Sequence, residues 1–290
     1  GKVDIVVTGT LYIVATPIGN LDDFSPRAQR TLAQVDLIVA EDTRHSAILM
    51  RHFGIETPML SMHEHNELSR IESLLERIRS GQSIAQISDA GTPLINDPGF
   101  RLVSAVREVG LPVTTIPGPS APLVALTLSG LPVHRFSFEG FLPSKEGART
   151  ERLQSLAEET RTMIFFESPR RVLSALQTME RCFGGERRVA VARELTKMHE
   201  SVYTAPLASL LVWIREDPNR LRGEFVLIVE GVCEAVVDGV EALRIVKLLA
   251  EELPPRKAAE LASKITGVKK NKLYQSLLEY VILLRWKLVR

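Results

Sequence analysis

The sequence predicts an α/β protein made of two α/β domains followed by a small helical domain, and three observations support this. Between residues 11 and 130, short apolar runs alternate with amphipathic stretches, as expected of a mostly parallel sheet with connecting helices. The pattern restarts near residues 130–135, and beyond residue 240 only helical periodicity is left. We therefore place the domains at residues 1–132, 133–234 and 237–290.

The first domain is expected to contain four strands joined by helices. The strands are Leu11–Ala15, Leu37–Ala40, Ile84–Ile87 and Val113–Ile116. The helices are Pro26–Leu32, Ser46–His52, Glu67–Ser80, Phe100–Glu108 and Ala121–Ser129. Gly, Pro, Asp and Asn cluster after several strands, where open α/β sheets bind their ligands.

The second domain is expected to be α/β with more antiparallel character. Its strands lie near Phe136–Glu139, Thr162–Phe166, Arg188–Ala192, Glu200–Tyr203 and Glu224–Glu230. Its helices are Ala148–Glu158, a helix opened by Ser168-Pro169, and Leu207–Ile214. The third domain is expected to hold helices at Val240–Leu253, Arg256–Ile265 and Lys269–Leu284, the last two joined by a turn of the helix-turn-helix type.

Composition excludes several classes of protein. Of the 290 residues, 45% are hydrophobic and 24% are charged, which is typical of a soluble globular protein. No apolar run approaches the ~20 residues that span a bilayer. Cys182 and Cys233 are the only cysteines, and their spacing fits neither a disulfide framework nor a metal site. We expect a cytoplasmic protein without a bound metal.

Charge is distributed unevenly along a chain whose net charge is only +1. Residues 237–290 contain eleven Lys or Arg against six Asp or Glu, a net charge of +5, which leaves −4 for the rest. Lys269, Lys270 and Lys272 open the last predicted helix. Such a segment is typical of a catalytic body with a basic appendage that binds nucleic acid, although a solvated helix face is the alternative.

Three loops that follow predicted strands are candidate ligand-binding segments. The first, Ala15–Leu21, contains neither the Gly-x-Gly-x-x-Gly pattern of a nicotinamide site nor a P-loop, and could be an ordinary turn. The second, Ser88–Gly99, is too long and too rich in Gly, Pro and Asp for a plain connection. In the third, Pro117–Pro122, Ser120 could either cap the next helix or border a ligand that its free amides bind.

A fourth loop carries groups suited to acid–base chemistry. Glu41 and Asp42 follow a strand and offer a possible base, and Arg44 offers a planar phosphate-binding fork. Alternatively, Asp42 is only the N-cap of the next helix. Other positions are weaker candidates, because a purely structural role explains them as well as a functional one. They are the charged strand end Ala192–Lys197, the glycine Gly223, and the basic residues Lys145, Arg149, Arg170 and Arg171.

Six segments in order closely resemble a known family. They are Thr16–Leu21, Glu41–Arg44, Ser88–Gly99, Pro117–Ala121, Glu139–Pro143 and Ala192–Lys197. Together they resemble the bacterial small-subunit ribosomal RNA methyltransferases of the tetrapyrrole methylase-like superfamily. The resemblance implies a homodimer in which S-adenosylmethionine binds in a cleft between the two α/β domains. It also implies 2′-O-methylation of a cytidine in the decoding region of small-subunit ribosomal RNA, either as free RNA or in the assembled subunit.

The resemblance also implies roles for individual residues. The expected cofactor contacts are Pro17, Ile18, Gly19, Asp89, Ala90, Gly91, Thr92, Ser120 and Ala121, with Phe166, Glu167 and Gly223 at the edge of the second domain. Our hypothesis for catalysis uses Glu41 or Asp42 as the base and Arg44 on a phosphate. The expected RNA contacts are Lys145, Arg149, Arg170, Arg171 and the three lysines of the last helix.

One departure and two alternatives bear on this hypothesis. Related tetrapyrrole methylases usually have Gly-x-Gly-Pro-Gly-Asp where this chain has Ala15–Asn20, which lowers the expectation of a tetrapyrrole substrate. A methyltransferase acting on a tetrapyrrole or another small molecule would use the same loops but would not need the basic segment. A nucleic-acid-binding regulator without enzymatic activity would need the basic segment but not the loops.

Overall fold

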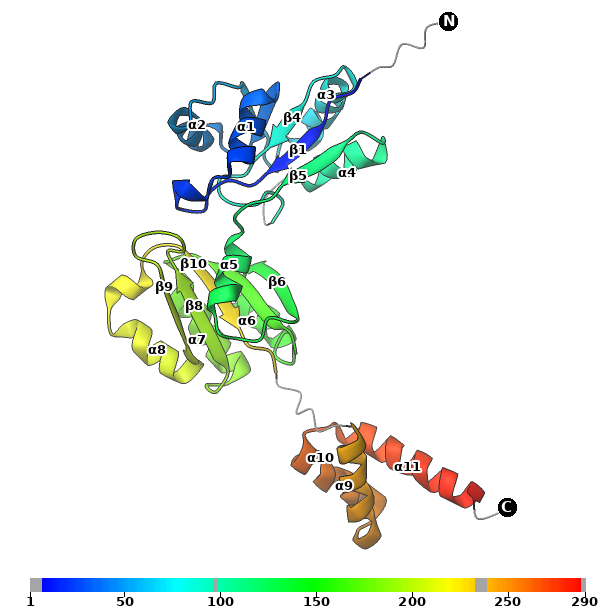
Figure 1. Ribbon diagram of the computed structural model, residues 1–290. Coiled ribbons are helices and arrows are strands. Elements are labelled where there is room, and N and C mark those ends of the chain that lie inside the picture. Colours follow the sequence, from blue (N-terminus) through cyan, green and yellow to red (C-terminus); the bar gives the residue numbers. More distant parts are fainter. Residues whose placement is uncertain (1–6, 96–98, 233–238, 288–290) are drawn as a thin grey trace, which may run out of the picture. The chain divides into compact units, whose positions relative to one another are not determined.

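The computed structural model describes residues 7–95, 99–232 and 239–287 (Figure 1). It divides into two compact units. The larger contains two five-stranded sheets and ends at Glu230, and the smaller contains the C-terminal helices together with Glu158–Arg161. The expected boundary between residues 234 and 237 lies outside the described residues.

The first sheet is fully parallel, as the alternation of strands and helices predicted. Its strands are β1 (Leu11–Val14), β2 (Leu37–Ala40), β3 (Met59–Ser61), β4 (Ile84–Gln86) and β5 (Val113–Ile116), in the order β3-β2-β4-β1-β5. The sequence analysis missed β3, because three half-buried residues are too few to show a strand pattern.

Helices cover both faces of this sheet, and each face has its own apolar core. The helical elements are η1 (Leu21–Asp23), α1 (Pro26–Gln34), α2 (Thr43–His52), α3 (Glu67–Arg79) and α4 (Phe100–Glu108). Leu32 of α1 and Met50 of α2 belong to one core. Leu74 of α3 and Leu102 of α4 belong to the other. The arrangement leaves the carboxyl ends of the strands to the loops that follow them.

The second sheet is mostly antiparallel, as expected. Its strands are β6 (Phe136–Phe141), β7 (Thr162–Glu167), β8 (Arg188–Arg193), β9 (Ser201–Pro206) and β10 (Phe225–Val229), in the order β6-β7-β10-β8-β9. Only the β6–β7 pair is parallel. The remaining elements of this part are α6 (Glu146–Ser155), α7 (Val172–Phe183), α8 (Leu207–Arg215) and η2 (Pro218–Leu221).

Helix α5 (Ala121–Leu128) packs on the second sheet, although the sequence analysis placed it in the first domain. Ala125 and Leu126 share a buried cluster with Ile164 and Ala190 on one face of that sheet. The opposite face is covered by α6, α7 and α8. Since β5 precedes α5 directly, the chain crosses from one sheet to the other at residues 117–120.

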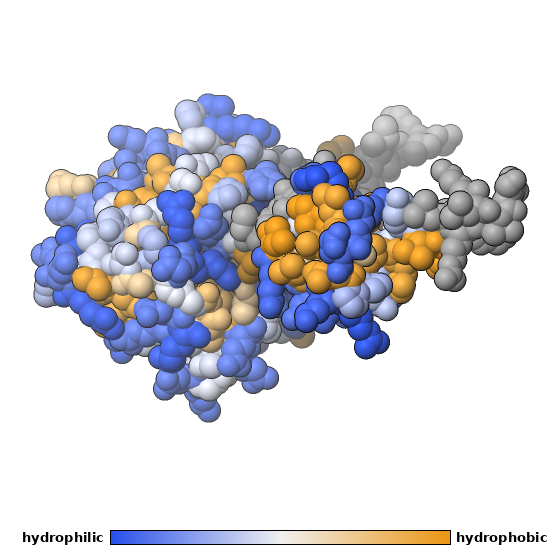
Figure 2. All heavy atoms as spheres, turned by 90° about the horizontal axis from the view of Figure 1, so that it is seen from below, coloured by the Kyte–Doolittle hydropathy of each residue, from blue (hydrophilic) through white to orange (hydrophobic). Residues whose placement is uncertain are grey.

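The smaller unit is a helical bundle of α9 (Gly239–Glu252), α10 (Pro255–Thr266) and α11 (Lys270–Lys287). Its core includes the small residues Ala258, Ala259 and Ala262, which allow the helices to approach closely. Helix α10 ends at Gly267, which has a left-handed backbone. Leu248, Leu261 and Ile265 of this unit are large apolar residues that are exposed. Figure 2 shows that apolar side chains gather in patches on one face of the molecule. Of the helices in the described ranges, none combines the length and apolar character needed to cross a membrane.

Candidate functional site

Three of the predicted loops meet at the carboxyl ends of β1, β4 and β5. Thr16 and Gly91 exchange two backbone hydrogen bonds of 3.1 Å, which ties the loop after β1 to the loop after β4. The Thr92 hydroxyl donates a 2.9 Å hydrogen bond to the Pro119 carbonyl, which adds the loop after β5. The three loops therefore form one connected structure.

A cavity of about 200 Å³ lies beside these loops. It is lined by Ala90, Gly91, Thr92, Ile95, Ser120, Ala121, Pro122, Phe141 and Phe166. Six of these residues were among the twelve expected cofactor contacts: Ala90, Gly91, Thr92, Ser120, Ala121 and Phe166. The cavity joins loops from the first sheet to side chains from the second.

The beginning of α5 forms one wall of the cavity. Ser120 occupies the N-cap position, but its side chain makes no capping hydrogen bond. The capping interpretation of Ser120 is therefore wrong. The first amides of a helix lack carbonyl partners within the helix, so this wall offers hydrogen-bond donors to a polar ligand group.

Another part of the cavity wall is aromatic. Phe166 of β7 lies between Phe138 and Phe141 of β6, with ring centroids 5.1 and 5.5 Å away. Phe141 is half exposed and stands opposite Phe166 in the parallel β6–β7 register. The sequence analysis did not include Phe141 among the site residues. The pairing of the two strands would have identified it, because paired residues on one sheet face lie side by side.

The cavity residues fit a ligand that combines an apolar ring with polar groups, such as S-adenosylmethionine. Aromatic and small apolar side chains line it together with loop backbone, which is typical of small-molecule sites. Gly91 has φ +79°, and a Cβ there would lie 3.0 Å from Ile18 Cγ2, so only glycine lets the loop come this close. The Thr16 hydroxyl is buried and has no hydrogen-bond partner among the described residues.

The other six expected cofactor contacts are not among the residues that line the cavity. Pro17 is buried, and Ile18 packs against the cluster under α5. Asp89 is exposed. Glu167 is buried and accepts a 2.9 Å hydrogen bond from its neighbour, the Ser168 amide. Burial raises the pKa of the Glu167 carboxyl, against the opposing effects of that hydrogen bond and of the charges of Arg171 and Arg149.

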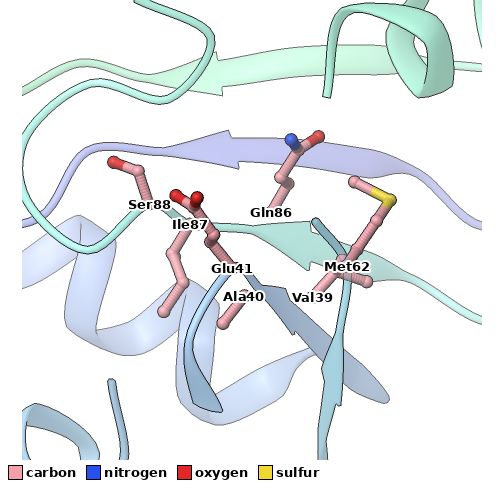
Figure 3. A pocket seen from close by; sticks show the side chains of 7 residues that line it. All are labelled: Val39, Ala40, Glu41, Met62, Gln86, Ile87 and Ser88. Carbon is pink, nitrogen blue, oxygen red and sulfur yellow. The ribbon is translucent and has the colours of Figure 1, made fainter. Parts of the chain in front are cut away.

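Glu41 lines a second, smaller pocket at the end of β2, together with Val39, Ala40, Met62, Gln86, Ile87 and Ser88 (Figure 3). Burial raises the pKa of Glu41, the negative charges of Asp89 and Asp42 raise it further, and His63 acts in the opposite direction. A raised pKa brings a carboxylate closer to the range in which it accepts a proton effectively.

Asp42 and Arg44 differ from Glu41 in their surroundings. The Asp42 carboxylate accepts hydrogen bonds from the amides of Arg44 and His45, at 3.0 and 3.3 Å, as the N-cap of α2. The capping alternative for Asp42 is therefore confirmed. The Arg44 side chain is exposed on the first turn of α2.

The basic positions predicted to contact RNA do not all lie on the surface. Lys145 and Arg170 are exposed and Arg171 is half-buried. Arg149, however, is only 6% exposed, and its guanidinium donates to the Thr178 hydroxyl at 3.2 Å and to the Ser144 carbonyl at 3.3 Å. The surface position expected for Arg149 is therefore wrong, because its side chain joins α6 to α7 within the protein.

Comparisons with known proteins identify the family. A family model described as Tetrapyrrole (Corrin/Porphyrin) Methylases matches residues 10–211. The ribosomal RNA small subunit methyltransferase I of Pseudomonas aeruginosa is 53% identical over 274 residues, covering 93% of this chain and 97% of that protein. Its counterpart from Escherichia coli O157:H7 is 51% identical over 272 residues, covering 93% and 95%. This chain belongs to the ribosomal RNA small subunit methyltransferase I family. It is a methyltransferase that depends on S-adenosylmethionine.

Solved structures agree with the fold of this methyltransferase family. The methyltransferase CobJ superposes with a TM-score of 0.57 at 20% identity, covering 78% of this chain and 95% of that structure. The uroporphyrin-III-C-methyltransferase of Thermus thermophilus gives 0.54 at 18% identity, covering 77% and 94%. These similarities show that the two sheets have the tetrapyrrole methylase fold.

The helical unit also matches the family. A model described as the RsmI C-terminal HTH domain matches residues 236–280, which agrees with the predicted helix-turn-helix. Lys269, Lys270 and Lys272 are exposed at the start of α11. Lys270 lies 3.7 Å from Glu260 of α10. Within the described ranges, no group of three His, Cys, Asp or Glu side chains is arranged to bind a metal ion.

Proposed function

We propose that this protein transfers a methyl group from S-adenosylmethionine to the 2′-hydroxyl of a cytidine in the decoding region of small-subunit ribosomal RNA. The observation that carries the proposal is the joining of two features in one chain: the connected loops around the cavity and the basic helix-turn-helix unit. The former suit the cofactor, and the latter suits an RNA substrate.

In this proposal the loops around the cavity hold the cofactor, and their main contribution is alignment. The bound cofactor supplies a methyl group activated by a sulfonium sulfur. Positioning the reacting groups in line can contribute about 7–11 kcal/mol. Ala90, Gly91 and Thr92 would bind through loop backbone, and Phe141 and Phe166 would contact the apolar part of the ligand. Ser120 and Ala121 would offer the amides at the start of α5.

We propose that Glu41, rather than Asp42, is the base that accepts the proton of the ribose 2′-hydroxyl. The Asp42 carboxylate is engaged by two amides at the start of α2, whereas the Glu41 carboxylate lines a small pocket at the end of β2 and has a raised pKa. Arg44, exposed one turn away, would hold a neighbouring phosphate through its guanidinium. Lys145, Arg170 and Arg171 would contact the RNA backbone on the second α/β part.

The three lysines of α11 would bind phosphates of the same RNA. Each neutralised phosphate contributes about 0.7–0.9 to the slope of log affinity against log salt. The triple variant Lys269→Ala, Lys270→Ala, Lys272→Ala should therefore lower that slope by up to about 2–3. The matched control removes three charges elsewhere, with Arg77→Ala, Arg79→Ala and Arg107→Ala on α3 and α4. An equal loss in both variants would assign the effect to net charge alone.

The deciding experiment offers methyl-labelled S-adenosylmethionine with assembled small subunits, free small-subunit RNA and a tetrapyrrole in parallel. The RNA must come from a strain that lacks the activity. We expect label at one ribose of the RNA, and we expect the phosphodiester bond on the 3′ side of that ribose to resist alkaline cleavage. Label on the tetrapyrrole alone would establish the alternative, a small-molecule methyltransferase. Cofactor binding without any transfer would contradict both assignments.

We also propose, from the family resemblance, that the protein acts in the cytoplasm as a homodimer. Sedimentation equilibrium of the full chain should give twice the mass of 32.2 kDa. A monomer that methylates RNA would contradict the proposed oligomeric state.

A further inference from the structure

The loop between β8 and β9, residues 194–200, has an unusual backbone. Among the described residues, only Leu94, Glu194 and Thr196 are non-glycine residues with positive φ, and this loop contains two of them, with φ +53° and +69°. Such conformations persist only where surrounding contacts impose them, and they are frequent at functional sites. The contacts of this loop therefore indicate which side chain the strained backbone holds in place.

Several contacts impose this backbone. The Glu194 amide donates to the Glu224 carbonyl at 3.0 Å, and the Lys197 amide donates to the Glu194 carbonyl at 3.1 Å. The Thr196 amide donates to a carboxylate oxygen of Glu200 at 2.8 Å. Leu195 is buried in the cluster under α5. Two of these contacts, at Glu194 and Leu195, fix the loop to the second sheet, and the other two fix its internal conformation.

Fixed in this way, the loop presents Lys197 between two carboxylates. Lys197 Nζ lies 2.7 Å from Glu194 Oε2 and 3.0 Å from Glu224 Oε2. Burial lowers the pKa of Lys197, but the two hydrogen bonds outweigh it and the pKa is raised. The ammonium is therefore charged and already neutralised, which suits neither a general base nor a phosphate-binding group.

The stem of Lys197 lies against the loop that follows β1. A Cβ on Gly19 would lie 2.7 Å from both Cγ and Cε of Lys197 and 3.0 Å from the Thr196 hydroxyl oxygen. That hydroxyl is buried and has no hydrogen-bond partner among the described residues. A Cβ on Gly223 would lie 2.6 Å from Glu194 Cδ. Gly19 thus leaves room for Lys197, and Gly223 leaves room for Glu194, the carboxylate with which Lys197 pairs.

This contact completes the support of the loop at residues 16–21. Thr16 is joined to Gly91 by backbone hydrogen bonds, and Ile18 packs on the cluster that contains Leu195. We propose that Lys197 is a positioning residue, which holds this loop through its packing on Gly19 and its ion pairs to Glu194 and Glu224. This proposal rests on the proposed role of these loops in binding the cofactor. It also gives Gly223 a role in making room for Glu194, rather than in lining the cavity.

The test measures hydrogen exchange of the full chain without ligand, together with its affinity for S-adenosylmethionine by calorimetry. Lys197→Met keeps most of the stem but removes the charge. We expect backbone amides at residues 16–21 to exchange about tenfold faster in this variant. If the binding-competent loop is populated tenfold less, the cofactor Kd rises by the same factor, about tenfold.

Two further variants complete the design. Lys197→Arg, which retains the charge, should restore both protection and affinity. Arg79→Met removes another cation that is held by two carboxylates, those of Glu72 and Glu76 at 3.6 Å. This variant should change neither the exchange of residues 16–21 nor the affinity for the cofactor. If Lys197→Met does not fold, Gly19→Ala decides, because it should displace the same side chain from the other side.

The outcomes separate this proposal from the proposed function. Exchange of residues 16–21 within about twofold of the original chain in Lys197→Met would overturn the positioning role, whatever the substrate is. Faster exchange and weaker cofactor binding, in a protein that does not methylate ribosomal RNA, would support the role of Lys197 and contradict the proposed substrate instead.

Discussion

The two sheets contribute to the candidate site in different ways. The first sheet is parallel, so its strands end at one edge, and the three loops there meet through backbone hydrogen bonds at Thr16, Gly91 and Pro119. The second sheet is mostly antiparallel and supplies side chains, namely the rings of Phe141 and Phe166 and the stem of Lys197. A parallel sheet positions backbone at its carboxyl edge, whereas an antiparallel sheet positions individual side chains.

The Glu41→Gln substitution should give the largest effect, because Glu41 is the one ionisable side chain of the first sheet to which we assign chemistry. Removal of a general base lowers turnover by about 10²–10⁴-fold. Cofactor affinity should not change, since Glu41 lines a different pocket from the cavity residues. Single-turnover methylation and calorimetry measure the two quantities separately.

The neighbouring carboxylate supplies the control for this prediction. Asp42→Asn retains an oxygen that can cap α2, so turnover and stability should stay close to those of the original chain. Asp42→Ala should lower the free energy of unfolding by about 1 kcal/mol through loss of the cap. A loss of turnover in Asp42→Asn as large as in Glu41→Gln would refute the assignment of the base to Glu41.

Stability should follow pH in the direction set by the raised pKa of Glu41. A carboxyl whose pKa is higher in the folded state stabilises the fold below its unfolded pKa. That contribution is lost as the pH rises through the folded value. As the pH rises from about 4 to about 7, Glu41→Gln should therefore gain stability relative to the original chain. Thermal unfolding at both pH values measures this difference, and a difference of opposite sign would contradict it.

The sequence predicted the backbone part of the site better than the side-chain part. The Gly- and Pro-rich composition of Ser88–Gly99 after an apolar strand indicated a binding loop, because the carboxyl ends of parallel strands share one edge. The individual contacts Ala90, Gly91 and Thr92 were implied by the family resemblance. The packing of α5 on the second sheet was not predictable in this way. Its residues are largely apolar, and this pattern does not indicate on which of the two sheets the helix packs.

Arg149 and Lys197 show the same limit for charged residues. Both follow patterns that are typical of exposed positions, yet Arg149 is buried against Thr178 and Lys197 is held between two carboxylates. One partner of each is distant in the sequence, Thr178 for Arg149 and Glu224 for Lys197, so only the folded chain brings these groups together. Burial of an arginine is favourable only with such hydrogen bonds, which local sequence does not reveal.

A substitution of Gly91 would test whether the first sheet contributes through its backbone. Gly91→Val places a branched side chain at φ +79° and forces Ile18 to move. The strain should cost about 1–3 kcal/mol of stability. Cofactor affinity should fall about 10- to 100-fold, equivalent to about 1.4–2.8 kcal/mol. Calorimetry and thermal unfolding measure the two effects.

Gly110 provides a matched position for this experiment. It has φ +74°, and a Cβ there would meet nothing within 4 Å. Gly110→Val should therefore lose stability without losing cofactor affinity. Equal affinities in Gly91→Val and Gly110→Val would show that the approach of the loops at Gly91 does not matter for binding.

Truncation of one ring tests the side-chain contribution of the second sheet, and here we expect the smallest effect. Phe141→Ala removes a half-exposed ring that borders the cavity. Aromatic contacts of this kind contribute about 0.5–1.5 kcal/mol, so cofactor affinity should fall about 2- to 12-fold. Phe136→Ala is the matched control, because Phe136 lies on the same strand, is similarly exposed and does not line the cavity. If both variants bind the cofactor equally well, the second sheet contributes to binding through Lys197 rather than through its rings. The contrast between the two sheets would then rest on one ion-paired side chain.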